Sequence, residues 1–199
     1  MDSIWRSEDL KRCSWCGDDP LYVKYHDEEW GRLVKDDHTL FEFLTLESAQ
    51  AGLAWITVLR KREGYREAFH NFDVEKVAAM TEEDVEQLMK FDGIVKNRRK
   101  IQSAITNARL FIEIQKEFGS FFNYLRSFFH GEFPVVNHPV TMADIPVTSP
   151  ESDAIAKDMK KRGFKFFGST ICYAHLQATG FVDDHIESCH CKHKPCTFT

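Results

Sequence analysis

The sequence of 199 residues has few of the residues that interrupt regular structure, with only six prolines and ten glycines. It also lacks an uncharged apolar run of about 18 residues, which is the length that a membrane-spanning helix needs. The first residues are rich in acid and contain no apolar stretch of the kind that a secretion signal has. These absences exclude a disordered or collagen-like chain, and we expect a cytoplasmic protein that does not enter a membrane.

Phenylalanine is abundant by contrast, with 17 residues in a chain that is 43% hydrophobic. A chain of this length buries roughly 70% of its unfolded surface, so a single core is expected. We predict an N-terminal extension over residues 1–12 and one domain over residues 13–199. Because no export signal is seen, the six cysteines fit metal ligation or burial better than disulfides.

Apolar residues recur at helical spacing along most of the chain, and no long alternating run predicts a strand. We therefore predict an all-α protein of about eight helices. The segment 43–59 has Glu47 as its single charge before Arg60, and Gly52 is expected to break it. The other expected helices span residues 64–69, 81–91, 97–112, 118–129, 149–162 and 168–179.

A glycine turn at Gly93 joins two of these helices and is followed by basic residues. Backbone amides at the start of a helix can hold a phosphate, so the turn is a candidate contact for a DNA backbone. Arg98 and Lys100 would add positive charge. The alternative is a set of ordinary solvated helix ends, and the net charge of −5 is unusual for a DNA-binding protein.

Two histidines and two cysteines suggest a metal site. His185 and Cys189 are four residues apart, and Cys13 and His26 could complete a Cys₂His₂ shell that joins the two ends of the chain. Other side chains are rival ligands, and adventitious metal binding by the tail is the alternative. The rivals are Cys16, His190, Cys191, His193 and Cys196.

Glu47 lies in an apolar stretch, where an unpaired carboxylate is costly. Aromatic residues nearby in the sequence are Tyr22, Tyr25, Trp30 and Trp55. Aromatic faces combined with a carboxylate suit a flat cationic ligand. The alternative is a surface glutamate beside ordinary core aromatics.

Several blocks of the sequence together resemble the 3-methyladenine DNA glycosylase I family. They include Cys13-x-Trp15, Asp19-Pro20-Leu21-Tyr22, Tyr25-His26-Asp27-x-Glu29-Trp30-Gly31, Leu46-Glu47, Gln50-Ala51-Gly52-Leu53-x-Trp55, Lys161-Arg162-Gly163-Phe164 and Asp184-His185 with Cys189. The resemblance implies the helix–hairpin–helix glycosylase fold with one structural Zn²⁺ per chain, held by Cys13, His26, His185 and Cys189. It implies a base pocket of Tyr22, Tyr25, Trp30, Glu47 and Trp55.

The resemblance also implies the reaction, which is hydrolysis of the N-glycosidic bond of 3-methyladenine in duplex DNA. The products would be an abasic site and free 3-methyladenine, and the enzyme would act as a monomer in base excision repair. Glu47 would recognise and stabilise the cationic base after the nucleotide is flipped out of the helix. Leu53 is our candidate for the residue that fills the vacated stack, with Gly93, Arg98 and Lys100 as further DNA contacts.

Two other hypotheses about the function stay open at this point. The chain could be a zinc-stabilised DNA-binding scaffold that has lost catalysis, although Glu47 and the pocket aromatics argue against it. It could also be a small-molecule protein that binds a purine or a quaternary amine, although such a protein does not need the Gly93 turn with its basic flank.

Overall fold

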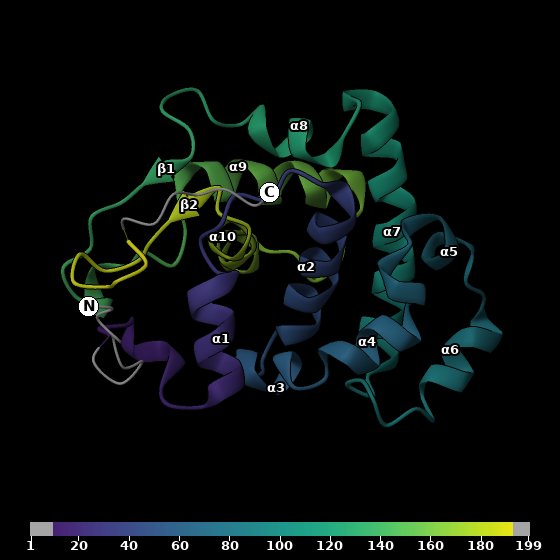
Figure 1. Ribbon diagram of the computed structural model, residues 1–199. Helices are drawn as coiled ribbons and strands as arrows, with labels where there is room; N and C mark the ends of the chain where they lie inside the picture. The colour runs from purple at the N-terminus through teal and green to yellow at the C-terminus, as the bar shows by residue number, and fades with distance from the viewer. Residues whose placement is uncertain (1–9, 193–199) are drawn as a thin grey trace, which may run out of the picture.

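The computed structural model describes residues 10–192 and is mostly helical (Figure 1). Two strands of two residues each, β1 (Val135–Val136) and β2 (Val182–Asp183), pair in parallel. The helices are α1 (Pro20–Glu28), α2 (Asp37–Gln50), α3 (Trp55–Leu59), α4 (Arg62–Ala68), α5 (Val74–Ala79), α6 (Glu82–Leu88), α7 (Arg98–Phe118), α8 (Phe121–Arg126), α9 (Pro150–Arg162) and α10 (Ser169–Ala178). The prediction of a helical protein is confirmed.

The break at Gly52 is confirmed and separates α2 from α3. Gly52 has a φ of +80°, a conformation that glycine adopts without strain. Residues 51–54 therefore form a short loop between the two helices. This loop places Glu47 near the end of α2 and Trp55 at the start of α3, on either side of one turn.

Helix ends follow the capping residues of the sequence. Asn97 accepts a hydrogen bond from the backbone of Lys100 and starts α7. Ser149 and Pro150 start α9, which ends at Gly163 with a φ of +107°. Thr81 forms a capping box with Asp84 at the start of α6. Each cap satisfies backbone groups that the helix itself leaves unpaired.

Besides the short strand pair, three features differ from the sequence-based expectation. Helix α1 was not predicted, although Asp19 caps it and Pro20 occupies its first turn. Helix α5 was not predicted either. His185 and Cys189, whose spacing of four residues equals about one helical turn, lie in an irregular turn after β2 rather than on a helix, and there the His185 amide donates a hydrogen bond to the Asp183 carboxylate.

Helix α2 runs through the centre of the molecule. All of its residues from Leu40 to Ala49 are buried, which explains why most of this segment is apolar. Aromatic rings fill the core around it, as in the stacked pair Phe111 and Phe121, whose centroids lie 4.2 Å apart. The helix thus provides a rigid support for the side chains at its end.

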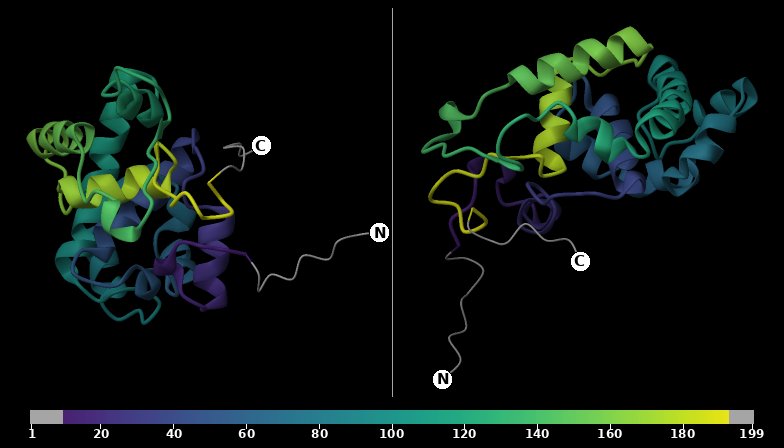
Figure 2. Two further views of the ribbon diagram at one scale, coloured as in Figure 1. Left: turned by 90° about the vertical axis from the view of Figure 1, so that its left-hand side faces the viewer. Right: turned by 90° about the horizontal axis from the view of Figure 1, so that it is seen from above.

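The first and last described residues lie side by side (Figure 2). The backbone of His190 donates a hydrogen bond to the carbonyl of Lys11. Arg12 forms an ion pair of 2.8 Å with Asp27 of α1. Residues 10–12 of the expected extension therefore pack against the domain. Within residues 10–192, no helix is long and apolar enough to span a bilayer.

Candidate functional site

A cavity of about 290 Å³ lies against α1, α2, α3 and α10. The structure brings all five residues of the expected base pocket to its wall. Six further residues complete the lining. The predicted residues are Tyr22, Tyr25, Trp30, Glu47 and Trp55, and the further residues are Trp15, Gln50, Met142, Ile145, Ala174 and Gln177.

The wall is mostly aromatic. The Trp15 ring lies 5.1 Å from Tyr22 and 5.0 Å from Trp30, and the Tyr25 ring lies 5.5 Å from Trp55. The indole N–H groups of Trp15 and Trp55 are buried without a hydrogen-bond partner among the described residues. Buried polar groups are normally paired, so these two donors are available to a ligand.

Glu47 is the charged residue of the cavity wall. Its side chain is 4% exposed, and no described residue forms an ion pair with it. Burial raises the pKa of Glu47 to about 8, because the carboxylate has lost its hydration without gaining a partner. The same carboxylate helps to raise the pKa of Tyr22 to about 12, after the larger effect of burial. A ligand cation in the cavity would remove the cost of ionising Glu47.

The additional lining residues come from separate parts of the chain. Met142 and Ile145 lie at a short 3₁₀ turn between β1 and α9, and Ala174 and Gln177 lie on α10. No local pattern in the sequence marks them, because only the fold brings these segments to α2. Trp15 had a signal, since it follows Cys13 in the motif that carries the family resemblance.

A second cluster of side chains lies behind Trp30. The donor atoms of His26, His185, Cys189 and Cys191 are all within 4.8 Å of one another, and all four residues are buried. The rings of Trp30 and His185 are 4.6 Å apart, so this cluster supports the wall of the aromatic cavity. Three of the four expected metal ligands are thus brought together.

The two histidines are oriented for metal binding. Nδ1 of His26 lies 2.8 Å from Asp27 and Nδ1 of His185 lies 2.8 Å from Asp183. The Nε2 atom of His185 is buried and has no partner within the described residues. Metal-binding histidines commonly pair one ring nitrogen with a carboxylate while the other binds the ion. These residues therefore fit a metal ion.

The fourth ligand has two candidates in the structure. Cys13 is fully buried and its thiol lies within hydrogen-bond reach of Cys189, but it is not one of the four mutually close donors. Cys191 is one of the four. A second group of donors shares His26 and Cys191 and includes Asp27 and His190. The Cys16 thiol contacts the carbonyl of Cys13 instead. His193 and Cys196 lie outside the described residues.

The candidate DNA-contact residues Gly93 and Arg98 lie at the turn between α6 and α7. Gly93 packs on Gly64 of α4 so closely that a Cβ on Gly64 would lie 2.2 Å from the Gly93 carbonyl oxygen. Lys61 donates a hydrogen bond of 2.8 Å to the carbonyl of Asp92. Arg98 is held in ion pairs of 2.8 Å with Glu82 and 2.6 Å with Glu86.

The other two candidates lie at the loop after α2. Leu53 is 36% exposed, so its side chain can reach a partner outside the protein. The Lys100 ammonium donates hydrogen bonds of 2.7 Å to the carbonyls of Ala49 and Ala51. The structure therefore places Lys100 beside the loop and gives its amino group two protein partners.

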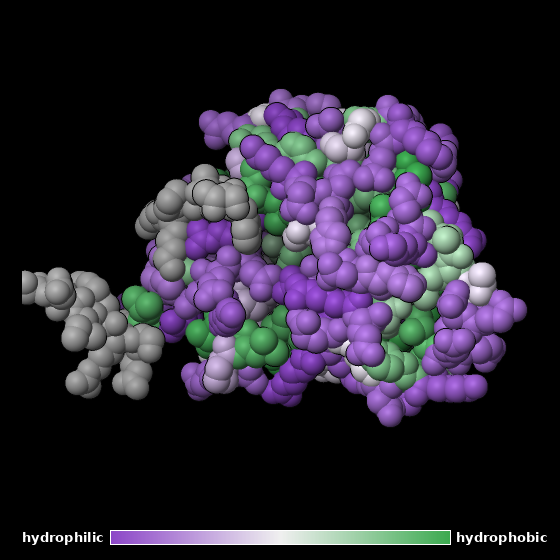
Figure 3. Space-filling view, turned by 45° about the vertical axis from the view of Figure 1, so that its right-hand side comes forward, coloured by the Kyte–Doolittle hydropathy of each residue, from purple (hydrophilic) through white to green (hydrophobic). Residues whose placement is uncertain are grey.

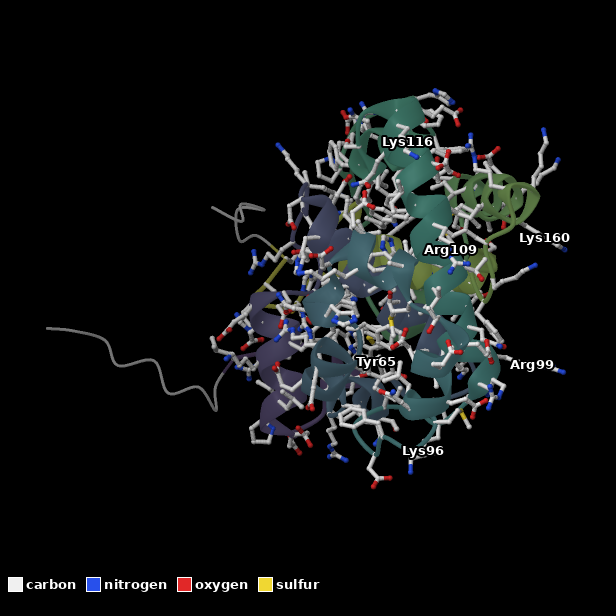
Figure 4. All side chains as sticks on the ribbon, turned by 90° about the vertical axis from the view of Figure 1, so that its right-hand side faces the viewer. Tyr65, Lys96, Arg99, Arg109, Lys116 and Lys160 are labelled. Atoms are coloured by element: carbon white, nitrogen blue, oxygen red, sulfur yellow. The ribbon has the colours of Figure 1, made fainter. Side chains whose placement is uncertain are left out.

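The surface near the turn is hydrophilic. Figure 3, in which the side of α4 to α7 comes forward, shows mostly hydrophilic residues with small apolar patches between them. Arg99 is exposed and projects away from the molecule, as does Lys96 (Figure 4). Positive charge thus reaches solvent on this side despite the overall net charge of −5.

Comparison with known proteins gives consistent results. The family model described as methyladenine glycosylase matches residues 15–193. DNA-3-methyladenine glycosylase 1 of Escherichia coli K12 is 50% identical over 92% of this chain and 97% of that protein. DNA-3-methyladenine glycosylase of Haemophilus influenzae is 44% identical over 91% of this chain and 97% of that protein.

Solved structures agree with the sequence comparison. A crystal structure of 3-methyladenine DNA glycosylase I is 50% identical, with a TM-score of 0.88 and coverage of 91% of this chain and 99% of that one. The Staphylococcus aureus enzyme, studied for its recognition of 3-methyladenine, is 37% identical with a TM-score of 0.88, and 93% and 98% of the two chains are covered. With the cavity and the donor cluster in place, these matches show that the chain belongs to the methyladenine glycosylase family.

Proposed function

We propose that this protein removes 3-methyladenine from alkylated duplex DNA by hydrolysing its N-glycosidic bond. Membership of the family and the names of the relatives support this activity. The observation that carries the proposal is Glu47, a buried carboxylate in a cavity of aromatic rings, with no ion-pair partner among residues 10–192. Such a cavity favours a planar cation over a neutral base.

The base enters this cavity after the nucleotide leaves the DNA stack. Tyr22, Tyr25, Trp30 and Trp55 provide ring faces for the methylated base, and ionised Glu47 provides the opposite charge. An unmethylated adenine carries no charge and would offer the Glu47 carboxylate no positive partner. Selectivity thus follows from charge rather than from a tight fit of shape.

The chemistry needs little acid catalysis. The cationic base departs with the electrons of the bond between its nitrogen and C1′, and becomes neutral 3-methyladenine. Water adds to C1′ and loses a proton, which leaves an abasic site. As positive charge moves from the base to the sugar in the transition state, Glu47 and the surrounding rings stabilise it.

We propose that a structural Zn²⁺ binds to His26, His185 and Cys189, with Cys13 as the fourth ligand. One ion per chain would join the start of the domain to its end and support Trp30 from behind, since Trp30 contacts His185. The ion would contribute to folding rather than to the hydrolysis. The domain would then span residues 13–199.

We propose that the α6–α7 turn is a helix–hairpin–helix element that holds the DNA backbone. Helix α7 begins five residues after Gly93, and the positive end of its dipole favours a phosphate there. Leu53 is exposed on the neighbouring loop and would occupy the space that the flipped nucleotide leaves. A direct contact of Arg98 with a DNA phosphate stays a prediction. In the structure Glu82 and Glu86 form ion pairs with the Arg98 guanidinium.

The activity is tested by the Glu47→Gln variant on methylated duplex DNA. We expect release of 3-methyladenine to fall about a hundredfold, because the neutral amide no longer stabilises the cation. Glu113→Gln is the matched control, since Glu113 is an exposed glutamate on α7 that is paired with Lys116. Equal release by the wild type and Glu47→Gln would contradict the assigned role of Glu47.

A further inference from the structure

Lys100 connects two parts of the protein that are distant in sequence. It lies in the first turn of α7, directly after the Gly93 turn, and its ammonium lies 2.7 Å from the carbonyl oxygens of both Ala49 and Ala51. Ala49 is in the last turn of α2, and Ala51 is the residue that follows the helix. The contact therefore joins the proposed DNA-binding turn to the end of the helix that carries Glu47.

The loop after α2 is also held from the cavity side. The Gln50 side chain donates a hydrogen bond of 2.9 Å to the carbonyl of Leu53, and the Leu53 amide donates one of 2.7 Å to the carbonyl of Gln50. Gln50 itself lines the aromatic cavity. The loop is thus hydrogen-bonded both to Lys100 and to Gln50, which lines the cavity.

The two carbonyls suit a positive charge. The last carbonyls of a helix have no partner within it and carry the negative end of the helix dipole. Hydrogen bonds from an ammonium to such groups are stronger than those between neutral partners. The Lys100 side chain is half-buried in this contact, whereas the neighbouring Arg99 is exposed and projects outward (Figure 4).

We propose that Lys100 is a positioning residue, which acts on base excision by fixing the loop of Leu53 and the end of α2 relative to the Gly93 turn. This inference rests on the proposed function of the cavity. When the turn holds the DNA backbone, the Lys100 contact sets where Leu53 meets the base stack and where the flipped base meets Glu47. Lys100 does this through protein carbonyls rather than through a DNA phosphate.

The Lys100→Met variant tests the inference, with Arg99→Met as the matched control on the adjacent position. For Lys100→Met we expect about a tenfold lower single-turnover rate of 3-methyladenine release with DNA saturated by enzyme, because the catalytic geometry is loosened. Its affinity for undamaged duplex DNA should stay within about twofold of the wild type, with the same dependence on salt concentration. Arg99→Met should instead weaken the affinity and reduce the salt slope by about one.

A double-mutant cycle with Leu53→Ala tests whether Lys100 acts through the loop. We expect the combined variant to be little slower than the slower single variant, because both changes disturb the same element. Quenching of tryptophan fluorescence by free 3-methyladenine reports whether the cavity is folded. If Lys100→Met fails this check, Lys100→Gln, whose amide can still donate a hydrogen bond, is measured in its place in the same cycle.

Three results would overturn the inference. They are a wild-type release rate in the Lys100 variant, a salt slope that falls by about one in that variant, and additive effects with Leu53→Ala. The first result leaves the proposed activity intact, and the second would show that Lys100 contacts a DNA phosphate. Absence of base release from the wild-type protein contradicts the proposed function instead, and the salt slopes still show whether Lys100 contacts DNA.

Discussion

Burial of the Glu47 carboxyl lowers the folding stability of the protein. At the end of α2 the carboxyl is 4% exposed, and its pKa is raised to about 8 by burial alone. A difference of one pKa unit between the folded and unfolded states corresponds to about 1.4 kcal/mol. A residue that only supported the fold would be better replaced by a neutral side chain of the same shape.

Replacing Glu47 with Gln should therefore stabilise the protein in a pH-dependent way. The folded pKa of Glu47 lies above the unfolded value, so the folded state binds the proton more tightly and loses stability as pH rises from about 4.5 to about 8. Glu47→Gln removes this loss. We expect it to raise the free energy of unfolding on the order of 3 kcal/mol more at pH 9 than at pH 4.

Urea unfolding of both proteins at the two pH values measures this difference. Glu113→Gln again serves as the control, because its exposed carboxylate has little to gain from neutralisation. A Glu47→Gln variant with the same advantage at pH 4 and pH 9 would show that Glu47 is not protonated in the folded protein at neutral pH.

At the scale of elements, the position of the proposed DNA-binding turn between α6 and α7 depends on its close packing against α4. Gly64 and Gly93 face each other, and the Tyr65 hydroxyl accepts a hydrogen bond of 3.3 Å from the backbone of Val95. Only glycine at position 64 leaves room for the carbonyl of Gly93. The contact fixes the position of the α6–α7 turn relative to the rest of the domain.

The Gly64→Ala variant should push the turn away from α4. A Cβ would lie 2.2 Å from the carbonyl oxygen of Gly93, so backbone must move, and we expect a loss of about 1–3 kcal/mol of stability. We also expect weaker binding of undamaged duplex DNA. Gly131→Ala is the control, because nothing lies within 4 Å of the Cβ it would add. Thermal unfolding and fluorescence anisotropy measure the two effects, and equal behaviour of both variants would contradict this packing.

Much of the element order could be predicted because its signals are local. Capping residues such as Asn97 and Ser149 mark helix starts, and Gly52 marks the break between α2 and α3. Helix α1 was missed even though Asp19 and Pro20 carry a start signal, because the aromatic residues after them lack a clear apolar stripe. The pairing of β1 with β2 could not be predicted, since two residues give no alternation.

The residues of the candidate site likewise divide into those that local sequence signals mark and those that only long-range packing brings to the cavity. The expected pocket residues all line the cavity. Four of them lie on the consecutive helices α1, α2 and α3, and Trp30 follows α1 by two residues. Met142 and Gln177 were missed because long-range packing alone brings them there. The assignment of Lys100 to DNA rested on charge and position, and its two carbonyl partners are visible only in the folded chain.

At the scale of the whole molecule, the cluster of histidines and cysteines that could hold a metal ion lies where the two ends of the domain meet. The donors come from α1 and from the turn after β2, and Cys13 lies beside them. We expect a chelator to release one zinc ion per chain and to lower the melting temperature. Metal binding and folding are coupled when the ligands are far apart in sequence.

Comparison of Cys13→Ser with Cys191→Ser assigns the fourth ligand. If Cys13 binds the ion, Cys13→Ser should weaken zinc affinity strongly while Cys191→Ser keeps a stoichiometry near one. Elemental analysis after dialysis gives the zinc content of each variant. The opposite ranking would place Cys191 in the shell, in agreement with the four mutually close donors of the structure.

The central claim is that a cation-selective cavity removes a methylated base from DNA. The most direct measurement is chromatographic analysis of the free bases that the zinc-loaded protein releases from methylated duplex DNA. We predict release of 3-methyladenine without release of 7-methylguanine. No release of 3-methyladenine from the folded, zinc-loaded protein would contradict the account.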